Sequence, residues 1–206
     1  MRQAVLDGFL GFTQTFESYL TFLYLDVDGL VTIGYGNLVD PVESVQGLEF
    51  AHPDGTIATQ AEVNQAWQIV KSQQASRAQG GDHYAKFTSI RATPAAIQKL
   101  CEQKLAQIDQ DVRKFFPAWD SFPAKAQLGI TSMCWAMGSG RLLDFVHFRA
   151  MANLENWAAV AVPHSDPNSC MMNEQGENQS FHLRNLANVE LFRRASLPND
   201  NEDSLT

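Results

Sequence analysis

Residues 17–36 read Glu17-Ser-Tyr-Leu-Thr-Phe-Leu-Tyr-Leu-Asp26-Val-Asp-Gly29-Leu-Val-Thr32-Ile-Gly34-Tyr-Gly36. Two short β-prone runs, residues 23–26 and 30–33, flank an Asp28-Gly29 pair, and an Asp-Gly turn between apolar runs is a strong signal of a β-hairpin. The glycines that follow tolerate a positive φ and end the second run. This stretch therefore predicts a small antiparallel sheet near the N-terminus.

Helical periodicity surrounds this hairpin on both sides. Apolar residues recur at helical spacing over residues 4–18, and a T-x-x-E capping box at Thr59 opens the next predicted helix. The helices predicted after the hairpin cover residues 59–74, 94–115, 124–137, 142–153, 155–162 and 181–195. Residues 124–137 are apolar nearly all round, which is typical of a buried central helix.

The pattern as a whole predicts an α+β protein that is mostly α. We expect one domain over residues 1–197, with a hairpin lobe at about 20–92 and a helical lobe at about 93–197 that includes the N-terminal helix. The polar segment 163–180 is expected to be a long loop, and residues 198–206 a flexible acidic tail.

Composition and charge exclude several classes of protein. The 206 residues carry a formal net charge of −8, which argues against a nucleic-acid binder. Three cysteines form no close pair and five histidines are scattered, so we expect no disulfide framework, no metal and no cofactor. No apolar run is long enough to cross a bilayer, and the N-terminus lacks the basic region of a signal peptide. We therefore expect synthesis in the cytoplasm and no membrane insertion.

Two carboxylates flank the predicted hairpin in a way that suits glycoside hydrolysis. Glu17 precedes the first strand and Asp26 follows it, so a hairpin can bring the two to opposite walls of one cleft. The aromatic neighbours Phe16 and Tyr19 and a nearby helix C-terminus favour the neutral form of Glu17. Asp26 lies beside a polar turn and is expected to stay ionised, and such a divergent pair suits an acid and its partner.

These residues also resemble a known signature. Residues 17–36 match E-x8-D-x2-G-x2-T-[IV]-G-x-G without a gap, and this pattern is similar to that of phage-type lysozymes, glycoside hydrolase family 24. The resemblance implies a lysozyme-like fold with a cleft between two lobes. It implies that Glu17 is the general acid, that Asp26 stabilises positive charge and orients the attacking water, and that Thr32 holds that water. The reaction is expected to invert the anomeric carbon.

The resemblance continues more weakly to the end of the chain. Residues 130–138 resemble the central buried helix of the family, and residues 181–192 resemble its last helix, where Arg184 falls at the place of an arginine that pairs with the catalytic glutamate. Arg184 can also be a surface cation. Substrate contacts are expected from Asp28, Tyr35, Leu38 and Trp135. Two of these have a simpler interpretation. Asp28 can serve only to form the turn, and Trp135 can be a core residue.

The chain departs from the family in four places. Asn37 stands where the family often has a structural histidine, Ala136 stands where some phage enzymes have a polar residue that contacts substrate, and the segments 39–93 and 163–180 are longer. Within the first of these segments a turn at residues 53–56, followed by a W-x-x-V-K helix from Trp67 to Lys71, is similar to lysozyme-like domains of bacterial toxins such as type VI secretion effectors and pesticin-like bacteriocins.

The resulting expectation is a muramidase that hydrolyses the β-1,4 bond between N-acetylmuramic acid and N-acetylglucosamine. It would serve as an endolysin or antibacterial effector that reaches peptidoglycan in the periplasm after delivery, act as a monomer, and have an immunity protein as a possible partner. One alternative is a lytic transglycosylase, which needs one glutamate and is disfavoured by Asp26 and Thr32. The other is a non-catalytic wall-binding or partner-binding module, an alternative motivated by the net charge and Asn37.

Overall fold

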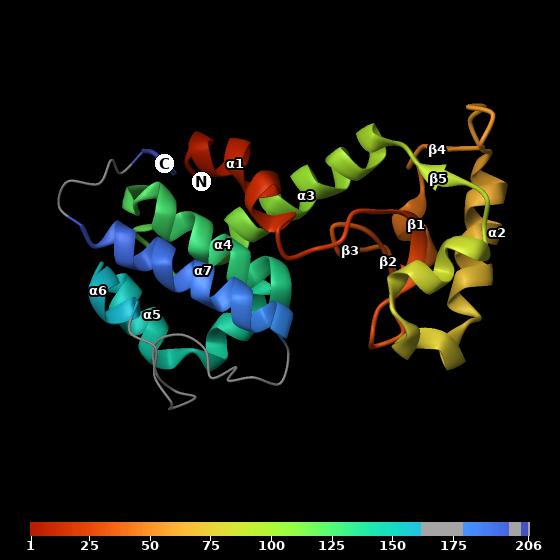
Figure 1. The fold of residues 1–206 in the computed structure, drawn as a ribbon. Coiled ribbons are helices and arrows are strands. Elements are labelled where there is room, and N and C mark those ends of the chain that lie inside the picture. The colour runs from red at the N-terminus through yellow and green to blue at the C-terminus, as the bar shows by residue number, and fades with distance from the viewer. Residues whose placement is uncertain (162–178, 198–202, 206) are drawn as a thin grey trace. The chain divides into compact units, whose positions relative to one another are not determined.

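The computed structural model describes residues 1–161, 179–197 and 203–205, and its elements fall into two units (Figure 1). Unit 1 comprises Met1–Phe16 and Lys104–Thr206, and unit 2 comprises Glu17–Gln103. The division falls inside helix α3 (Pro94–Val112), whereas the sequence suggested a boundary just before this helix. The described chain is mostly helical with a small antiparallel sheet, which confirms the expected α+β class.

The hairpin expected from the Asp-Gly turn is present in unit 2. Strand β1 (Leu20–Leu25) pairs antiparallel with β2 (Val31–Gly34), with Tyr24 opposite Thr32 in the ladder. A third strand, β3 (Asn37–Leu38), pairs with β2 and gives the order β1-β2-β3. The sequence did not indicate β3, because a two-residue strand leaves no alternation to detect.

The rest of unit 2 is built from short elements around one helix. Helix α2 (Gln60–Lys71) begins at the predicted capping box, in which the side chains and backbone amides of Thr59 and Glu62 bond reciprocally. A second sheet joins β4 (Phe50–Ala51) to β5 (Arg91–Ala92), a pairing too distant in sequence to predict from a local pattern. The 3-10 helices of this unit are η1 (Val42–Val45), η2 (Gln74–Gln79) and η3 (Gly81–Lys86).

Helix α1 (Gln3–Thr13) is shorter than the periodicity predicts. It ends in a turn through residues 14–16, in which the amide of Phe16 donates to the carbonyl of Thr13 at 2.9 Å. The prediction to residue 18 was wrong because the chain must already be extended where Leu20 pairs with Gly34. Glu17 therefore lies in a bend after the helix, beyond the last turn in which a helix dipole acts strongly.

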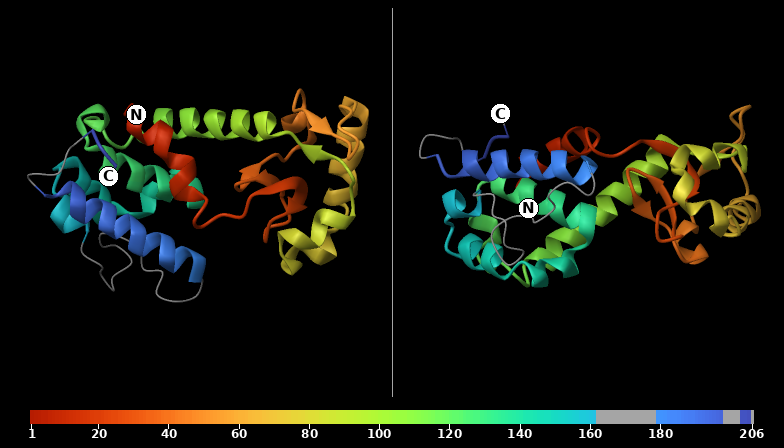
Figure 2. Two further views of the ribbon diagram at one scale, coloured as in Figure 1. Left: turned by 45° about the horizontal axis from the view of Figure 1, so that its top comes forward. Right: turned by 60° about the horizontal axis from the view of Figure 1, so that its bottom comes forward.

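Unit 1 is built around helix α4 (Ala124–Met137), of which every residue from Ala124 to Trp135 is buried. Helix α7 (Gln179–Ala195) packs along α4, and α1 packs against α4 as well (Figure 2). The shorter helices of this unit are η4 (Trp119–Ser121), η5 (Ser139–Asp144), α5 (Val146–Asn153) and α6 (Trp157–Val160). None of the described helices has the length and apolarity needed to cross a lipid bilayer.

Most of the expected loop at 163–180 lies outside the described residues, because residues 162–178 are not described. Its last two residues belong to α7, which begins at Gln179. The expected tail is described only at residues 203–205. There Arg2 forms an ion pair with Asp203, and the Lys125 ammonium donates to the carbonyl of Ser204 at 2.7 Å. These three residues therefore pack on unit 1, which differs from the flexible end that the acidic composition suggested.

Two glycines in helices of unit 1 make a matched test of this packing. A Cβ at Gly129 of α4 would lie 2.7 Å from Cζ of Phe192, whereas a Cβ at Gly11 of α1 would meet no atom within 4 Å. We expect Gly129→Ala to lower the free energy of unfolding by about 1–3 kcal/mol through overpacking. Gly11→Ala is expected to raise it by about 0.5–1 kcal/mol through helix propensity. Urea unfolding of both variants measures the difference, and equal effects would contradict the close α4–α7 contact.

Candidate active site

The Asp26 carboxylate is fixed by the turn that it begins. Its Oδ1 atom accepts hydrogen bonds from the backbone amides of Asp28 at 3.0 Å and Leu30 at 2.8 Å. The Asp26 carbonyl accepts from the amide of Gly29, and its own amide donates to the carbonyl of Leu30, both at 3.0 Å. Aspartate favours such turns because its short side chain can reach amides two or more residues ahead. The turn therefore sets the direction of this carboxylate.

Glu17 lies beside the second glycine of the G-x-G pair. It is half-buried, and its Oε2 atom is 3.6 Å from the position that a Cβ on Gly36 would occupy. Gly36 has a φ of +76°, a conformation that side chains other than glycine rarely adopt. The glycine thus serves two purposes, since it forms the turn after β2 and lets the backbone pass next to the carboxylate.

Tyr24 joins the two carboxylates into one cluster. It lies directly opposite Thr32 in the β1–β2 ladder and two residues before Asp26 in the chain. Burial raises the pKa of the Tyr24 hydroxyl, and the nearby negative charges of Glu17 and then Asp26 raise it further. Tyr24 is therefore opposite Thr32 and within electrostatic range of both carboxylates. The sequence analysis does not single out Tyr24, although strand alternation places it on the same face as Asp26.

Thr32 is a buried member of this cluster, with 4% of its surface exposed. Its hydroxyl donates to the carbonyl of Leu30 at 3.2 Å, which fixes the hydroxyl proton. A hydroxyl that donates in this way keeps lone pairs that can accept a hydrogen bond from a water molecule. The geometry is compatible with the predicted role of Thr32 in holding a water.

The three predicted substrate contacts of unit 2 are accessible to different degrees. Asp28 is exposed at the hairpin turn, and Leu38 is 54% exposed and lies opposite Thr32 in the β2–β3 ladder. Tyr35 is half-buried, and its ring packs against that of Tyr19 with centroids 4.8 Å apart. Tyr19 is itself 42% exposed, so the pair offers an aromatic surface of which the sequence predicts only Tyr35.

The two predicted site residues of unit 1 are both buried. The ring of Trp135 packs on Phe9 with centroids 4.9 Å apart, and the Lys104 ammonium lies 4.0 Å from its centroid. With 4% of its surface exposed, Trp135 is a core residue in this structure and its assignment as a sugar contact is not supported. Arg184 is 3% exposed, so the surface-cation alternative is wrong.

Arg184 makes its described contacts inside unit 1. Its Nη1 atom donates to the carbonyl of Ser132 at 3.4 Å, and its guanidinium lies 5.2 Å from the ring centroid of Phe16. Phe16 is the last residue of unit 1 before Glu17 in the chain. The arginine is thus held by α4 and by the residue that precedes the candidate acid.

Asn37, where the resembled family often has histidine, is buried at the start of β3. Its Oδ1 atom accepts from the thiol of Cys101 at 3.6 Å, and its Nδ2 atom has no hydrogen-bond partner among the described residues. Gly34 allows this approach, because a Cβ there would lie 3.0 Å from Asn37 Oδ1 and 2.8 Å from Cγ2 of Ile97. The polar partner at this position is therefore a thiol of α3.

An ion pair between Asp40 and Lys71 supports the backbone of the hairpin. Asp40 Oδ2 accepts from the amide of Val31 at 3.0 Å and from the Lys71 ammonium at 2.5 Å. Burial acts to raise the pKa of the Asp40 carboxyl, but the bond from Lys71, the bond from Val31 and the Lys71 charge outweigh it. The pKa is therefore below its ordinary value of 3.8.

This lowered pKa predicts a loss of stability in acid. The contribution of Asp40 is fully present above its unfolded-state pKa and is lost as the pH falls through the lower folded-state value. We expect Asp40→Asn to remove that part of the acid sensitivity, so that the stability difference between wild type and variant shrinks from about pH 6 to about pH 2. Urea unfolding across this range measures the difference, and a constant difference would contradict the assignment.

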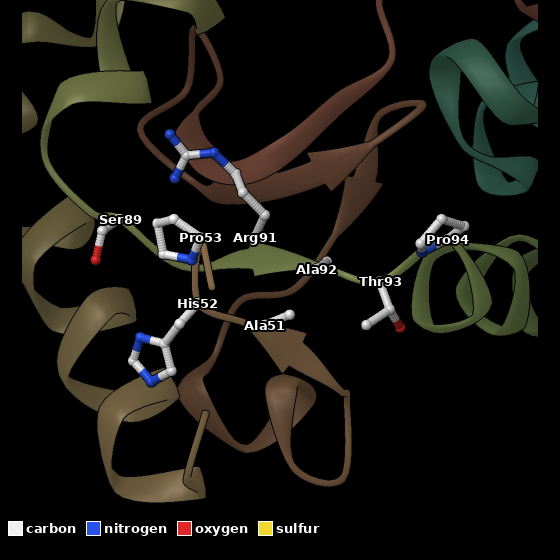
Figure 3. A pocket seen from close by; sticks show the side chains of 8 residues that line it. All are labelled: Ala51, His52, Pro53, Ser89, Arg91, Ala92, Thr93 and Pro94. Carbon is white, nitrogen blue, oxygen red and sulfur yellow. The ribbon is translucent and has the colours of Figure 1, made fainter. Parts of the chain in front are cut away.

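Two cavities of unit 2 lie away from the carboxylate cluster. The larger, of about 410 Å³, is formed along β4 and β5 (Figure 3) and is lined by Ala51, His52, Pro53, Ser89, Arg91, Ala92, Thr93 and Pro94. A second, of about 260 Å³, shares His52 and Ser89 with it and continues along α2. Neither contains Glu17, Asp26 or Thr32.

The polar groups of the larger cavity are engaged in holding the fold. The Arg91 guanidinium donates to the carbonyls of Ala85, Thr88 and Ile90, and Figure 3 shows it on the side of β5 opposite to His52. The Thr93 hydroxyl accepts from the amide of Ala96 at the start of α3. The candidate active site is therefore the carboxylate cluster and not either of the two cavities. The described residues also contain no group of three acidic, histidine or cysteine side chains placed to hold a metal ion.

Comparison with known proteins does not assign this site to a known family. Neither models of known protein families nor curated protein sequences give a match to the chain.

Proposed function

We propose that the chain is a muramidase that hydrolyses the β-1,4 bond between N-acetylmuramic acid and N-acetylglucosamine with inversion. The observation that carries the proposal is a single hairpin on which Thr32 lies opposite Tyr24, Asp26 begins the turn, Glu17 lies beside Gly36, and the charges of both carboxylates act on the Tyr24 hydroxyl. An inverting glycosidase needs a proton donor and a carboxylate that activates water, and both carboxylates are present here. The division into a hairpin unit and a helical unit supports a lysozyme-like fold.

In this proposal each residue has one task. Glu17 protonates the leaving oxygen as its bond to the anomeric carbon breaks, Asp26 stabilises the cationic sugar, orients the attacking water and accepts its proton, and Thr32 accepts a hydrogen bond from that water. The turn amides on Asp26 support its task, because a carboxylate with one oxygen fixed needs little reorganisation during the reaction. Arg184, which contacts Phe16 within unit 1, is given no step in this scheme, and the supporting role that the resemblance implies for it stays a prediction.

Product analysis of purified peptidoglycan tests the proposal. Mass spectrometry is expected to show fragments that have gained one water, produced by the wild type and not by Glu17→Gln. Fragments with a 1,6-anhydro end would identify a lytic transglycosylase instead. Binding to the wall without any release of fragments would identify the non-catalytic module. Each of these two outcomes would overturn the muramidase assignment.

A further inference from the structure

The W-x-x-V-K pattern of α2 makes contacts that the proposed chemistry does not explain. The indole of Trp67 donates to the carbonyl of Val39 at 2.8 Å, Val70 is fully buried, and Lys71 reaches the hairpin turn. Trp67 and Lys71 therefore attach the helix to the residue after β3 and to the turn before β2. The pattern links α2 to the hairpin that carries Asp26 and Thr32.

Lys71 holds the turn directly and also through Asp40. Its ammonium donates to the carbonyl of Gly29 at 3.0 Å and to Asp40 Oδ2 at 2.5 Å, and Asp40 in turn accepts from the amide of Val31. Gln74 Nε2 also donates to the carbonyl of Gly29 at 3.0 Å. The backbone on both sides of Leu30 is thus held from α2 and η2.

The held backbone is the same backbone that binds the Asp26 carboxylate. The amide of Leu30 donates to Asp26 Oδ1, and the amide of Gly29 donates to the Asp26 carbonyl. A shift of the Gly29 peptide would therefore move a donor of Asp26. The ammonium suits this place because three donors on a compact head can serve two acceptors at once.

We propose that Lys71 is a positioning residue for Asp26, which holds the turn from Asp26 to Val31 through the Gly29 carbonyl and Asp40. Its effect on activity rests on the proposed function, whereas its effect on the turn does not. Lys71→Met keeps the length of the stem but removes the charge and the donors. Lys99→Met is the matched control, because Lys99 is exposed on α3 in the same unit.

Hydrogen exchange tests the effect on the turn without substrate. We expect the amides of Leu30 and Asp28 to exchange about tenfold faster in Lys71→Met than in wild type, since they lose support for their bonds to Asp26. Amides of unit 2 outside the turn, such as that of Ile97, which donates to the Thr93 carbonyl at 3.1 Å, report whether unit 2 stays folded. Unchanged exchange at Leu30 would overturn the proposal, as would equal acceleration at Leu30 and Ile97, and the same measurement on Lys99→Met is expected to give wild-type rates.

Steady-state kinetics tests the effect on the reaction. We expect Lys71→Met to lower kcat by about 10- to 100-fold with a much smaller change in KM, because a displaced carboxylate weakens the transition state more than ground-state binding. Lys71→Arg is expected to restore part of kcat. A fall in kcat that only follows the loss of folded protein, or a KM effect alone, would overturn the positioning role. An inactive wild type would overturn the muramidase proposal, while the exchange measurement would still decide whether Lys71 holds the turn.

Discussion

Replacement of Glu17 by glutamine is expected to lower kcat on peptidoglycan by about 10²- to 10⁴-fold, the usual contribution of a general acid. Glutamine has nearly the same shape but carries no acidic proton, so the leaving oxygen can no longer be protonated. Glu17 is half-buried beside Gly36, and glutamine fits that space, so KM and the free energy of unfolding should change little. Turbidity clearance and reducing-end release measure the rate.

Glu43→Gln is the matched control for this variant. Glu43 is exposed on η1 of the same unit, and the substitution makes the same change from carboxyl to amide. Its rate is expected to equal that of wild type. If Glu17→Gln kept wild-type activity while remaining folded, Glu17 could not be the acid and the proposed mechanism would fail.

The second large effect is expected at Asp26, where Asp26→Asn should lower kcat by about 10²- to 10³-fold through loss of electrostatic stabilisation. The amide oxygen of asparagine can still accept from the amides of Asp28 and Leu30, so the turn is preserved while the charge is lost. Asp26→Ala also removes both of these bonds and is expected to cost about 1–2 kcal/mol of stability in addition. Kinetics and urea unfolding together separate the two effects.

Asp26 is also the position that separates the enzymatic alternatives. A lytic transglycosylase depends on one glutamate, so it would lose activity in Glu17→Gln but keep it in Asp26→Asn. Asp82→Asn serves as the control, because Asp82 is exposed on η3 in the same unit. Equal rates for Asp26→Asn and Asp82→Asn would therefore contradict the role of Asp26.

The parts of the fold that could be predicted from sequence are those decided by neighbouring residues. The hairpin follows from an Asp-Gly turn between apolar runs, and α2 begins where Thr59 and Glu62 form a capping box. Helix α4 is buried from Ala124 to Trp135, as its apolar residues on nearly all sides indicate. The candidate residues Glu17, Asp26 and Thr32 were found in the same way, because their spacing within twenty residues is local information.

The remaining features depend on contacts between distant residues. Helix α1 ends early because the next strand must pair with β2. The apolar spacing of the helix carries no information about that pairing. The pairing of β4 with β5 and the bonds from Lys71 to Gly29 and Asp40 join segments that are far apart in the chain. Trp135 looked equally suited to a core or to a sugar contact, because an aromatic side chain serves both and only burial decides.

Gly36 limits how this site can evolve. Any other residue there would have to adopt a φ of +76°, and its first side-chain atom would touch the carboxylate of Glu17. Any single substitution at this position would therefore strain the backbone. Under the proposed function, a change in the surroundings of Glu17 would come from neighbours in strand conformation, such as Tyr24 in β1, whose hydroxyl the charges of Glu17 and Asp26 both affect.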